Sequence, residues 1–361
     1  MKVLFIVRGT LYTNTGGDTT QILQTARYLK ELGVQVTIKS SKEEITYGEY
    51  DLLHLFNITR PADILKHIER SQKPFVISPI FIDYSEFDRT VRKGYTGSIL
   101  RCLQINGIEY VKTLARSVFN GEKIASRKYL IYGQKRSIKK ILRQAKLLLT
   151  NSYSEYDRLE KQYHIKKPFA VIPNAVGDLF LEASRNIPVK EETLVLCVAR
   201  IEGLKNQLHL IQALNKTRYT LVLIGRAASN QATYYRLCRE AAAANVRFVG
   251  HIPQEDLIDY YLRAKVHILP SWFETTGLSS LEAAVLGCNI VITEKGDTRE
   301  YFQDHAWYCD PARPGSILQA VDQAAASPFN DSLQKKIISE YTWMQAARKT
   351  LAAYQEVIYP L

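Results

Sequence analysis

Two successive series of alternating strand-like and helix-like segments constrain the fold of this chain more than any other feature. The first series opens with KVLFIV at residues 2–7, a continuous apolar run that is typical of a parallel strand buried on both faces. A segment with helical periodicity follows at 19–33, and Gly33 is placed to end that helix. Further strand-like runs stand at 34–40, 50–56, 73–80, 145–152 and 168–174. This order predicts a doubly wound α/β domain with a parallel sheet.

The second series begins after DLFLEASRNIPVKEE at 178–192, a polar stretch that we interpret as a linker. Strand-like runs recur at 193–200, 219–226, 246–250, 265–271 and 288–294, with helix-like segments between them. A chain of 361 residues is too long for one ordinary core, so two domains are expected. We predict domains at 1–180 and 190–338, facing each other across a cleft at the carboxyl ends of their sheets, and a final amphipathic helix at 339–361.

Several classes of protein are disfavoured by what the sequence contains. The first apolar run ends at Arg8, which is too early for a signal peptide, and no run approaches the roughly 20 residues that span a bilayer. The five cysteines are scattered without a C-x-x-C motif, and the histidines have no zinc-ligand spacing. These features predict a cytoplasmic protein with reduced thiols and no metal site.

The stretch SWFETTGLSSLEAA at 271–284 carries two carboxylates around a predicted helix start. Glu274 falls in the strand-to-helix loop, and Glu282 falls on the second turn of the helix. Free amides and the helix dipole make the helix start an anion site, and Gly277 allows a phosphate to approach the backbone. The two carboxylates are then spaced to bond hydroxyls on either side of a diphosphate. A capped core helix with two incidental glutamates is the alternative interpretation.

Two cations follow the first strand of the second domain, in VARIEGLKNQ. Arg200 and Lys205 therefore belong to the carboxyl edge of that sheet, where they would neutralise a diphosphate leaving group without a metal ion. Without the rest of the site, an Arg and a Lys in a loop are more often solvated surface residues. At the other end of the chain, Gly16 and Gly17 follow the first strand and permit close approach of a ligand. They do not form G-x-G-x-x-G, so a nicotinamide site is unsupported.

Together these stretches resemble the retaining, nucleotide-sugar-dependent glycosyltransferases of family 4, which have the GT-B fold. The matching features are Gly16-Gly17, IPNAVGDLF at 172–180, Arg200 with Lys205, Glu274 to Glu282 as E-x7-E, and Gly296 with Glu300 as G-x-x-x-E. The resemblance implies metal-independent transfer of a sugar, from a UDP-sugar by default, to a saccharide acceptor. It also implies that the final helix crosses back to the first domain.

The resemblance assigns a role to each matching residue. Arg200 and Lys205 would bind the donor diphosphate, Glu274 would contact the transferred sugar, and Glu282 would bond the ribose hydroxyls. The rest of the implied donor site comprises Gly16, Gly17, Gly225, Thr276, Gly277, Leu278 and Glu300. Many family members carry a histidine where this chain has VISPIFIDYSEF at 76–87. Asp83 and His54 are the polar candidates to contact the acceptor instead, and either is also consistent with a structural role.

One segment supplies the whole excess of positive charge. The chain has a formal net charge of +12, and residues 89–146 contain 15 Lys or Arg against two acidic residues. On a helical wheel for 134–149, apolar side chains gather on one side and cations on the other. We predict a patch for an anionic membrane surface, in which aromatic residues meet the headgroups. Its members are Tyr129, Tyr132, Lys135, Arg136, Lys139, Lys140 and Arg143.

This patch predicts peripheral association with the inner face of the membrane and a lipid-linked acceptor, with a soluble anionic acceptor as the alternative. Two other functions stay open at this point. One is a related fold with different nucleotide-sugar chemistry, such as an epimerase. The other is a non-enzymatic nucleic-acid binder that uses the basic segment. Nucleic acid is not expected as a partner, because no nucleic-acid motif is present and the donor motifs would go unexplained.

Overall fold

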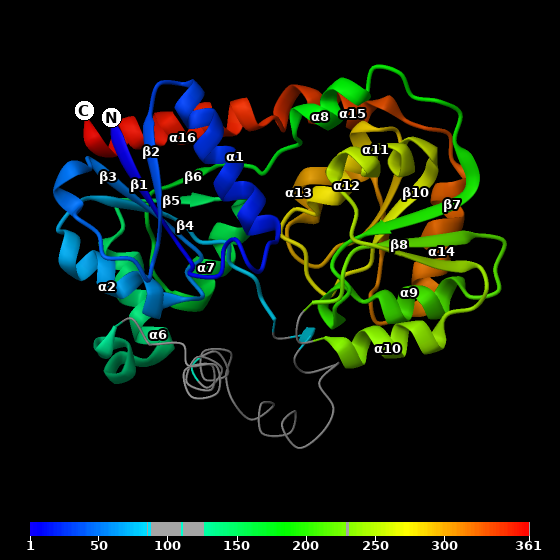
Figure 1. Ribbon diagram of the computed structural model, residues 1–361, viewed down its shortest axis with the longest axis horizontal. Coiled ribbons are helices and arrows are strands. Elements are labelled where there is room, and N and C mark those ends of the chain that lie inside the picture. Colours follow the sequence, from blue (N-terminus) through cyan, green and yellow to red (C-terminus); the bar gives the residue numbers. More distant parts are fainter. Residues whose placement is uncertain (85, 88–109, 111–125, 229–230, 361) are drawn as a thin grey trace. The chain divides into compact units, whose positions relative to one another are not determined.

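The computed structural model describes residues 1–84, 86–87, 110, 126–228 and 231–360 (Figure 1). The chain divides into two compact units. Unit 1 contains Met1–Phe81, Asp88–Asn174 and Trp343–Leu361, and unit 2 contains Ile82–Phe87 and Ala175–Thr342. Each unit is built on a six-stranded parallel sheet, which confirms the predicted α/β class.

Unit 1 has the strand order β2-β1-β3-β4-β5-β6. Its strands are β1 (Lys2–Val7), β2 (Gln35–Ser40), β3 (Leu52–Phe56), β4 (Phe75–Ser78), β5 (Leu147–Thr150) and β6 (Phe169–Val171). Its helices are α1 (Gly17–Glu31), the 3₁₀ helix η1 (Tyr47–Glu49), α2 (Pro61–Ser71), α6 (Arg127–Gln144), α7 (Tyr153–Tyr163) and α16 (Trp343–Ile358). The apolar run of β1 is buried from Val3 to Val7, as expected for a strand between two layers of helices.

The two helix layers of unit 1 are made by different parts of the chain. Helix α2 packs beside α6, and both cover Leu4 and Ile6 of β1. Helix α1 packs against α16, the last helix of the chain. The Tyr354 hydroxyl of α16 lies 2.6 Å from Nδ1 of His54 on β3. As predicted, the terminal helix therefore belongs to the first unit.

Unit 2 has the strand order β12-β11-β10-β7-β8-β9. Its strands are β7 (Glu191–Val198), β8 (Thr220–Ile224), β9 (Val246–Gly250), β10 (Ala264–Leu269), β11 (Asn289–Thr293) and β12 (Trp307–Cys309). Its longer helices are α8 (Asp178–Ala183), α9 (Gln207–Leu214), α10 (Ala232–Ala241), α11 (Gln254–Arg263), α12 (Leu278–Val285), α13 (Thr298–Phe302), α14 (Pro314–Ala326) and α15 (Asp331–Glu340). Short 3₁₀ helices are η2 (Gly203–Lys205) and η3 (Gln303–His305).

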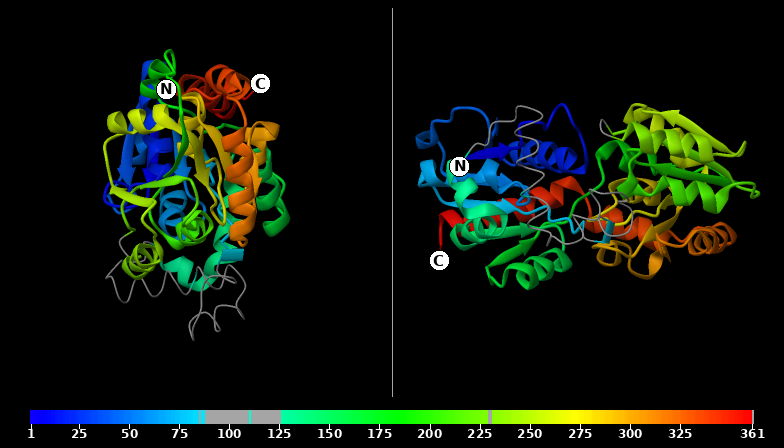
Figure 2. Two further views of the ribbon diagram at one scale, coloured as in Figure 1. Left: turned by 90° about the vertical axis from the view of Figure 1, so that its right-hand side faces the viewer. Right: turned by 90° about the horizontal axis from the view of Figure 1, so that it is seen from below.

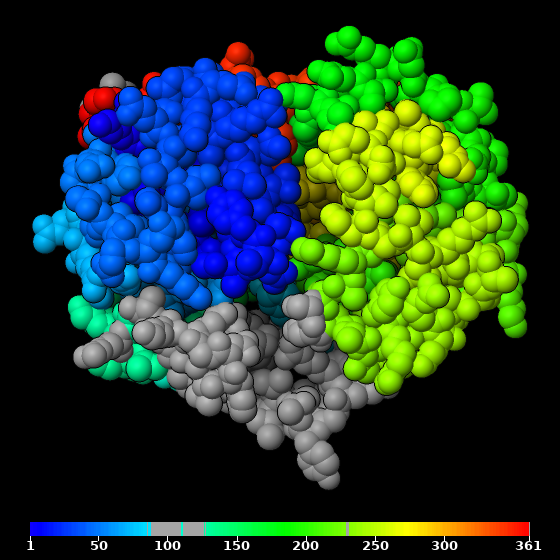
Figure 3. All heavy atoms as spheres, viewed as in Figure 1, coloured from blue at the N-terminus to red at the C-terminus, as the bar shows by residue number. Residues whose placement is uncertain are grey.

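The strand order of unit 2 reverses between β7 and β10, which are direct neighbours. In a doubly wound sheet this switch point opens a crevice at the carboxyl ends of the strands. Helices flank the sheet on both faces (Figure 2). Helices α10 and α11 lie on the outer surface (Figure 3), and α10 buries Cys238 as its one core residue.

The stretch at 178–192 is not an extended linker, contrary to the sequence interpretation. It contains α8 and the first residues of β7. Phe180 of α8 is buried in the core of unit 2, with its ring 6.0 Å from that of Tyr261. The physical reason is that 179–181 is a short apolar run inside the polar stretch, and α8 buries Phe180 and packs Leu181 and Ala183 against the core. Among the helices that the structure describes, none is long and apolar enough to cross a membrane.

Candidate active site

The loops that carry the predicted donor residues leave the same edge of the sheet in unit 2. Gly225 follows β8 directly, Arg200 follows β7 by two residues, and Glu274 and Gly296 follow β10 and β11. These four strands are consecutive and parallel, so their carboxyl ends meet at one edge. Residues that are up to 96 positions apart in the sequence are thereby gathered at the switch point.

The centre of the site is an ion pair between Lys205 and Glu274. Lys205 Nζ lies 2.5 Å from Glu274 Oε1, and the Ser271 hydroxyl donates to the same oxygen at 2.6 Å. The Glu274 side chain is 7% exposed. A carboxylate so buried is held in one position by these two donors. The contact between Lys205 and Glu274 agrees with their predicted shared site. Ser271 was missed, although it ends the strand segment that leads to Glu274.

The backbone of Glu274 is anchored against Gly296. The Glu274 amide donates to the Lys295 carbonyl at 3.0 Å, and the Asp297 amide donates to the Glu274 carbonyl at 2.9 Å. Gly296 has φ +105°, and a Cβ built there would lie 2.0 Å from the Glu274 carbonyl oxygen. Glycine is therefore required at this position by the close approach of two backbone segments. It acts on the site through Glu274.

Arg200 lies at the same edge, with its side chain 36% exposed. Its Nη2 donates to Glu202 Oε1 at 3.0 Å, and its carbonyl accepts from Gln207 Nε2 at 2.9 Å. The loop is also tied to the neighbouring strand, because a Cβ at Gly225 would lie 1.9 Å from the Ala199 carbonyl oxygen. Gly225 thus supports the loop of Arg200 through its backbone, and the guanidinium keeps access to solvent.

Helix α12 presents its amino end at this edge. It begins after Gly277, which has φ +75° and ψ 60°, and Thr276 before it is buried. The first amides of a helix have no partner within the helix, so Leu278 at the first position adds to a local site for anions. Phosphate binding by Thr276, Gly277 and Leu278 stays a prediction. The side chain of Glu300, on α13 after β11, is half-buried.

Glu282 is a half-buried carboxyl on α12. The Tyr261 hydroxyl of α11 donates to Glu282 Oε2 at 3.0 Å. Burial raises the pKa of Glu282 to about 7, and the bond from Tyr261 opposes that rise. Glu282 therefore changes protonation near neutral pH. Tyr261 was missed by the sequence analysis, because it lies 21 residues away on another helix.

The glycine pair of unit 1 ends a loop that is organised around Arg8. Arg8 pairs with both carboxylate oxygens of Asp18, at 2.6 Å and 3.0 Å. It also donates to the carbonyls of Thr10 and Asn14, at 2.7 Å each. Gly16 and Gly17 then begin α1. The sequence analysis used Arg8 only as the end of an apolar run and missed its role in the loop.

The two acceptor candidates have different outcomes. His54 is buried on β3, with Nδ1 2.6 Å from the Tyr354 hydroxyl and Nε2 2.9 Å from the Ser78 hydroxyl. Burial lowers its pKa to about 3. Both ring nitrogens are engaged inside unit 1, so the structure contradicts an acceptor contact and supports the structural alternative. Asp83 is half-buried in the segment Ile82–Phe87 of unit 2, and its acceptor contact stays a prediction.

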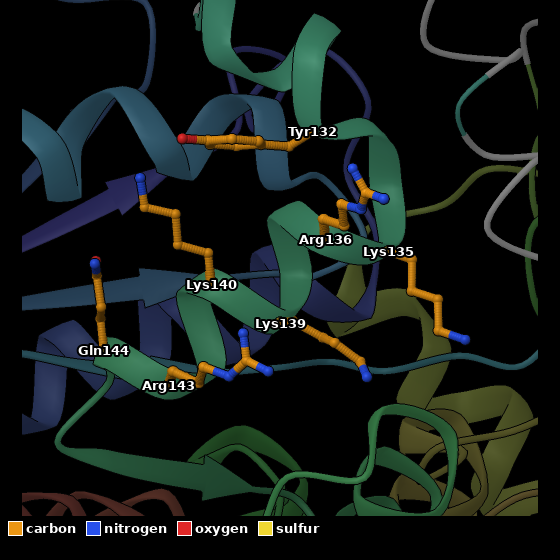
Figure 4. A pocket seen from close by; sticks show the side chains of 7 residues that line it. All are labelled: Tyr132, Lys135, Arg136, Lys139, Lys140, Arg143 and Gln144. Carbon is orange, nitrogen blue, oxygen red and sulfur yellow. The ribbon is translucent and has the colours of Figure 1, made fainter.

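The predicted membrane patch requires one correction. Tyr129 is fully buried, and its hydroxyl donates to Gln134 Oε1 at 2.7 Å, so it has no surface to offer a headgroup. The other members lie on α6 around an open pocket: Tyr132, Lys135, Arg136, Lys139, Lys140 and Arg143 (Figure 4). Residues 88–109 and 111–125 of the basic segment lie outside the described residues. In the described part of the chain, no group of three or more His, Cys, Asp or Glu is arranged to hold a metal ion.

Comparison with solved structures identifies the fold. Sucrose-phosphate synthase from Thermosynechococcus elongatus superposes with a TM-score of 0.73 and 16% identity, covering 98% of each chain. Anabaena HepE, solved in complex with UDP and glucose, superposes with a TM-score of 0.66 and 14% identity, covering 98% of this chain and 99% of that one. The fold is GT-B. The prediction of two Rossmann-like sheets with a returning terminal helix is confirmed.

Sequence comparison places a family match on unit 2 of this GT-B chain. Residues 181–342 match the family described as glycosyl transferases group 1, and they include every predicted donor residue of that unit. O-antigen chain mannosyltransferase B of Escherichia coli is 25% identical over 160 residues, which are 43% of this chain and 42% of that protein. The chain spans about half the length of the curated relatives it matches.

Proposed function

We propose that the protein is a retaining glycosyltransferase that moves a sugar from a UDP-sugar to a lipid-linked saccharide acceptor, in the synthesis of a surface polysaccharide or glycolipid. The observation that carries the proposal is the Lys205–Glu274 pair. It lies at the switch point of unit 2, inside the residues that match the glycosyl transferases group 1 family. The relative from Escherichia coli is an O-antigen chain mannosyltransferase, which supports a polysaccharide product.

The donor side of the reaction follows from the charges at the edge of unit 2. When the bond between the anomeric carbon and the phosphate breaks, the diphosphate gains negative charge. Arg200 and Lys205 provide two fixed cations for that charge, and the amide of Leu278 adds the dipole of α12. Because these groups are in place before the reaction, little reorganisation is needed. They favour the transition state over the bound donor, and they supply this stabilisation without a metal ion.

Glu274 has the geometry of a group that orients the sugar. Its Oε1 is already held by Lys205 and Ser271, which leaves Oε2 to accept a bond from a sugar hydroxyl. A bound diphosphate competes for Lys205, while Ser271 keeps the carboxylate in position. In the transfer, the acceptor oxygen bonds to the anomeric carbon on the face that the phosphate leaves. The departing phosphate oxygen takes the acceptor's proton, so the anomeric configuration is retained.

The nucleotide part of the donor is assigned to α12 and its neighbours. Glu282 is placed beyond the helix start, where its carboxyl would bond ribose hydroxyls. HepE was solved with UDP in a fold that covers both units of this chain, which supports uridine as the base. The basic face of α6 supports an acceptor held at an anionic membrane surface, with the protein bound peripherally on the cytoplasmic side.

A thermal-shift experiment tests the donor site directly. UDP-glucose, GDP-mannose and ADP-glucose are added to the wild type, to Lys205→Ala and to Lys335→Ala. Lys335 is a matched control, because its side chain is 73% exposed on α15 and pairs only with Asp331 among the described residues. We expect the UDP-sugar to stabilise the wild type and the control, by about 2.7 kcal/mol at 100 times Kd, and Lys205→Ala to lose this. Absence of a shift with every nucleotide-sugar would reject the proposed function.

A further inference from the structure

Helix α6 is bent, and the bend makes its basic face concave. Gly133 has φ 65° and ψ −177°, a backbone conformation that is essentially restricted to glycine. It joins two helical segments, 127–132 and 134–144, that run in different directions (Figure 4). A straight helix presents a convex row of side chains. The bend instead lets the ring of Tyr132 on the first segment face Lys140 of the second.

The bend is held by hydrogen bonds of two buried side chains, one on each side of Gly133. The Tyr129 hydroxyl, on the first segment, donates to Gln134 Oε1 at 2.7 Å. Gln134 Nε2, on the second segment, donates to the Thr59 carbonyl at 2.8 Å. Tyr129 and Gln134 are both buried, so these bonds tie the two segments to each other and to the body of unit 1. The concave face is therefore a fixed feature of the fold.

The concave face holds an open pocket of about 650 Å³. Seven residues line it: Tyr132, Lys135, Arg136, Lys139, Lys140, Arg143 and Gln144. In Figure 4 the Tyr132 and Lys140 side chains lie side by side, whereas Lys135 and Lys139 extend from the other side of the second segment. The volume falls within the ordinary range for small-molecule sites and is larger than a single phosphate requires.

Most of the positive charge in this pocket is uncompensated. Lys140 is the exception, because its Nζ lies 3.0 Å from Glu69 Oε1 and 5.1 Å from the centre of the Tyr132 ring. The other cations are Lys135, Arg136, Lys139 and Arg143, and none of these has an ion pair within the described residues. Like charges this close repel one another, and a polyanion in the pocket would relieve the repulsion.

We propose that this pocket binds the diphosphate group of an amphiphilic lipid carrier, and so holds the acceptor by its anchor. Four unpaired cations exceed the charge of a single phosphodiester and suit the higher charge of a diphosphate. Arg136 and Arg143 supply planar guanidinium groups that bind phosphate oxygens in pairs. The inference rests on the proposed function in one respect, because the lipid carrier is the acceptor of that reaction. All residues that line the pocket belong to unit 1, and none of them is a predicted donor residue.

The test is cosedimentation of the full chain with phosphatidylcholine vesicles that contain one of three amphiphiles. These are an alkyl diphosphate, an alkyl monophosphate and phosphatidylglycerol, at equal surface charge. We expect binding to alkyl diphosphate vesicles to be at least about tenfold tighter than to the other two, and inorganic pyrophosphate to compete. Equal binding to all three at matched charge, or no effect of pyrophosphate, overturns the pocket and leaves only diffuse attraction to an anionic surface.

Two variants locate the binding on α6. Arg136→Ala with Lys139→Ala removes two pocket cations, and we expect a roughly 30-fold loss of affinity for alkyl diphosphate vesicles. The matched control is Lys161→Ala with Lys166→Ala, which removes the same charge from the exposed surface of unit 1. We expect the control to lose less than about threefold. Equal losses in the two double variants overturn the assignment to this pocket.

Gly133→Ala separates shape from charge, since it keeps every cation. A Cβ at Gly133 would meet no heavy atom within 4 Å, so the variant is strained only through its backbone. We expect this variant to unfold cooperatively on heating, as the wild type does, but to prefer alkyl diphosphate vesicles less strongly. An unchanged preference overturns the role of the bend. UDP-glucose binding is measured in the same preparations. If the wild type does not bind UDP-glucose, the proposed function is refuted. If it binds UDP-glucose but shows no selectivity for diphosphate, the pocket alone is refuted.

Discussion

Gly296→Ala is a sharp test of how the candidate site is built, because Gly296 is expected to act through Glu274 rather than by touching a ligand. Alanine at φ +105° is strained by about 1–2 kcal/mol. Its Cβ would also lie 2.0 Å from the Glu274 carbonyl oxygen, so the two backbone segments must separate. Separation breaks the bonds from the Glu274 and Asp297 amides, which are worth about 1 kcal/mol each. We therefore expect unit 2 to lose about 3–4 kcal/mol of its free energy of unfolding.

Gly250→Ala is the matched control for strain. Gly250 also has a positive φ, +87°, but a Cβ there would meet no heavy atom within 4 Å. We expect it to cost only the strain, about 1–2 kcal/mol. Urea unfolding followed by tryptophan fluorescence measures both, because Trp272 is buried two residues from Glu274. Equal losses in the two variants would show that the backbone contact with Glu274 contributes nothing, and the account of the site would be wrong.

Three further predictions concern ionisable groups. Burial raises the pKa of Glu282 to about 7 from an unfolded value near 4.5, so the folded state binds a proton more tightly and the free energy of unfolding falls as pH rises from 4.5 to 7. Glu282→Gln should remove this fall, which amounts to about 3 kcal/mol, in melting experiments across that pH range. Burial lowers the pKa of His54 to about 3, so the free energy of unfolding is full above pH 6.5 and falls by about 1.4 kcal/mol per pH unit as His54 protonates in the unfolded state. His54→Gln should remove this dependence, which corresponds to one proton, between pH 6.5 and 3. Arg8→Ala removes the ion pair of Asp18 and leaves it, among the described residues, only the bond from the Thr19 amide, so the free energy of unfolding should fall by about 2–4 kcal/mol and amide hydrogen exchange at 10–17 should rise. Unchanged exchange would show that the loop holds without Arg8.

The parts of this structure that were predictable from sequence are those set by local patterns. A continuous apolar run identified β1, the alternation of strand-like and helix-like segments identified β10, and the same alternation placed Glu274 in the loop after β10 and Glu282 on the helix that follows. Ser271, Tyr261 and Arg8 were missed because their roles depend on which loops and helices become neighbours after folding. No periodicity in the sequence carries that information.

The basic helix shows how one backbone angle limits what a sequence pattern can predict. On a continuous helix, nine residues correspond to a rotation of about 180°, so Tyr129 would lie opposite the buried Ile138 and face solvent. Because the chain changes direction at Gly133, the first segment turns Tyr129 into the core. The second segment still buries the apolar face that the sequence predicts for 134–145. The same angle makes the cationic face concave. Charge density was therefore readable from the sequence, but the shape that distinguishes a diphosphate pocket from a flat basic surface depends on the φ of a single glycine.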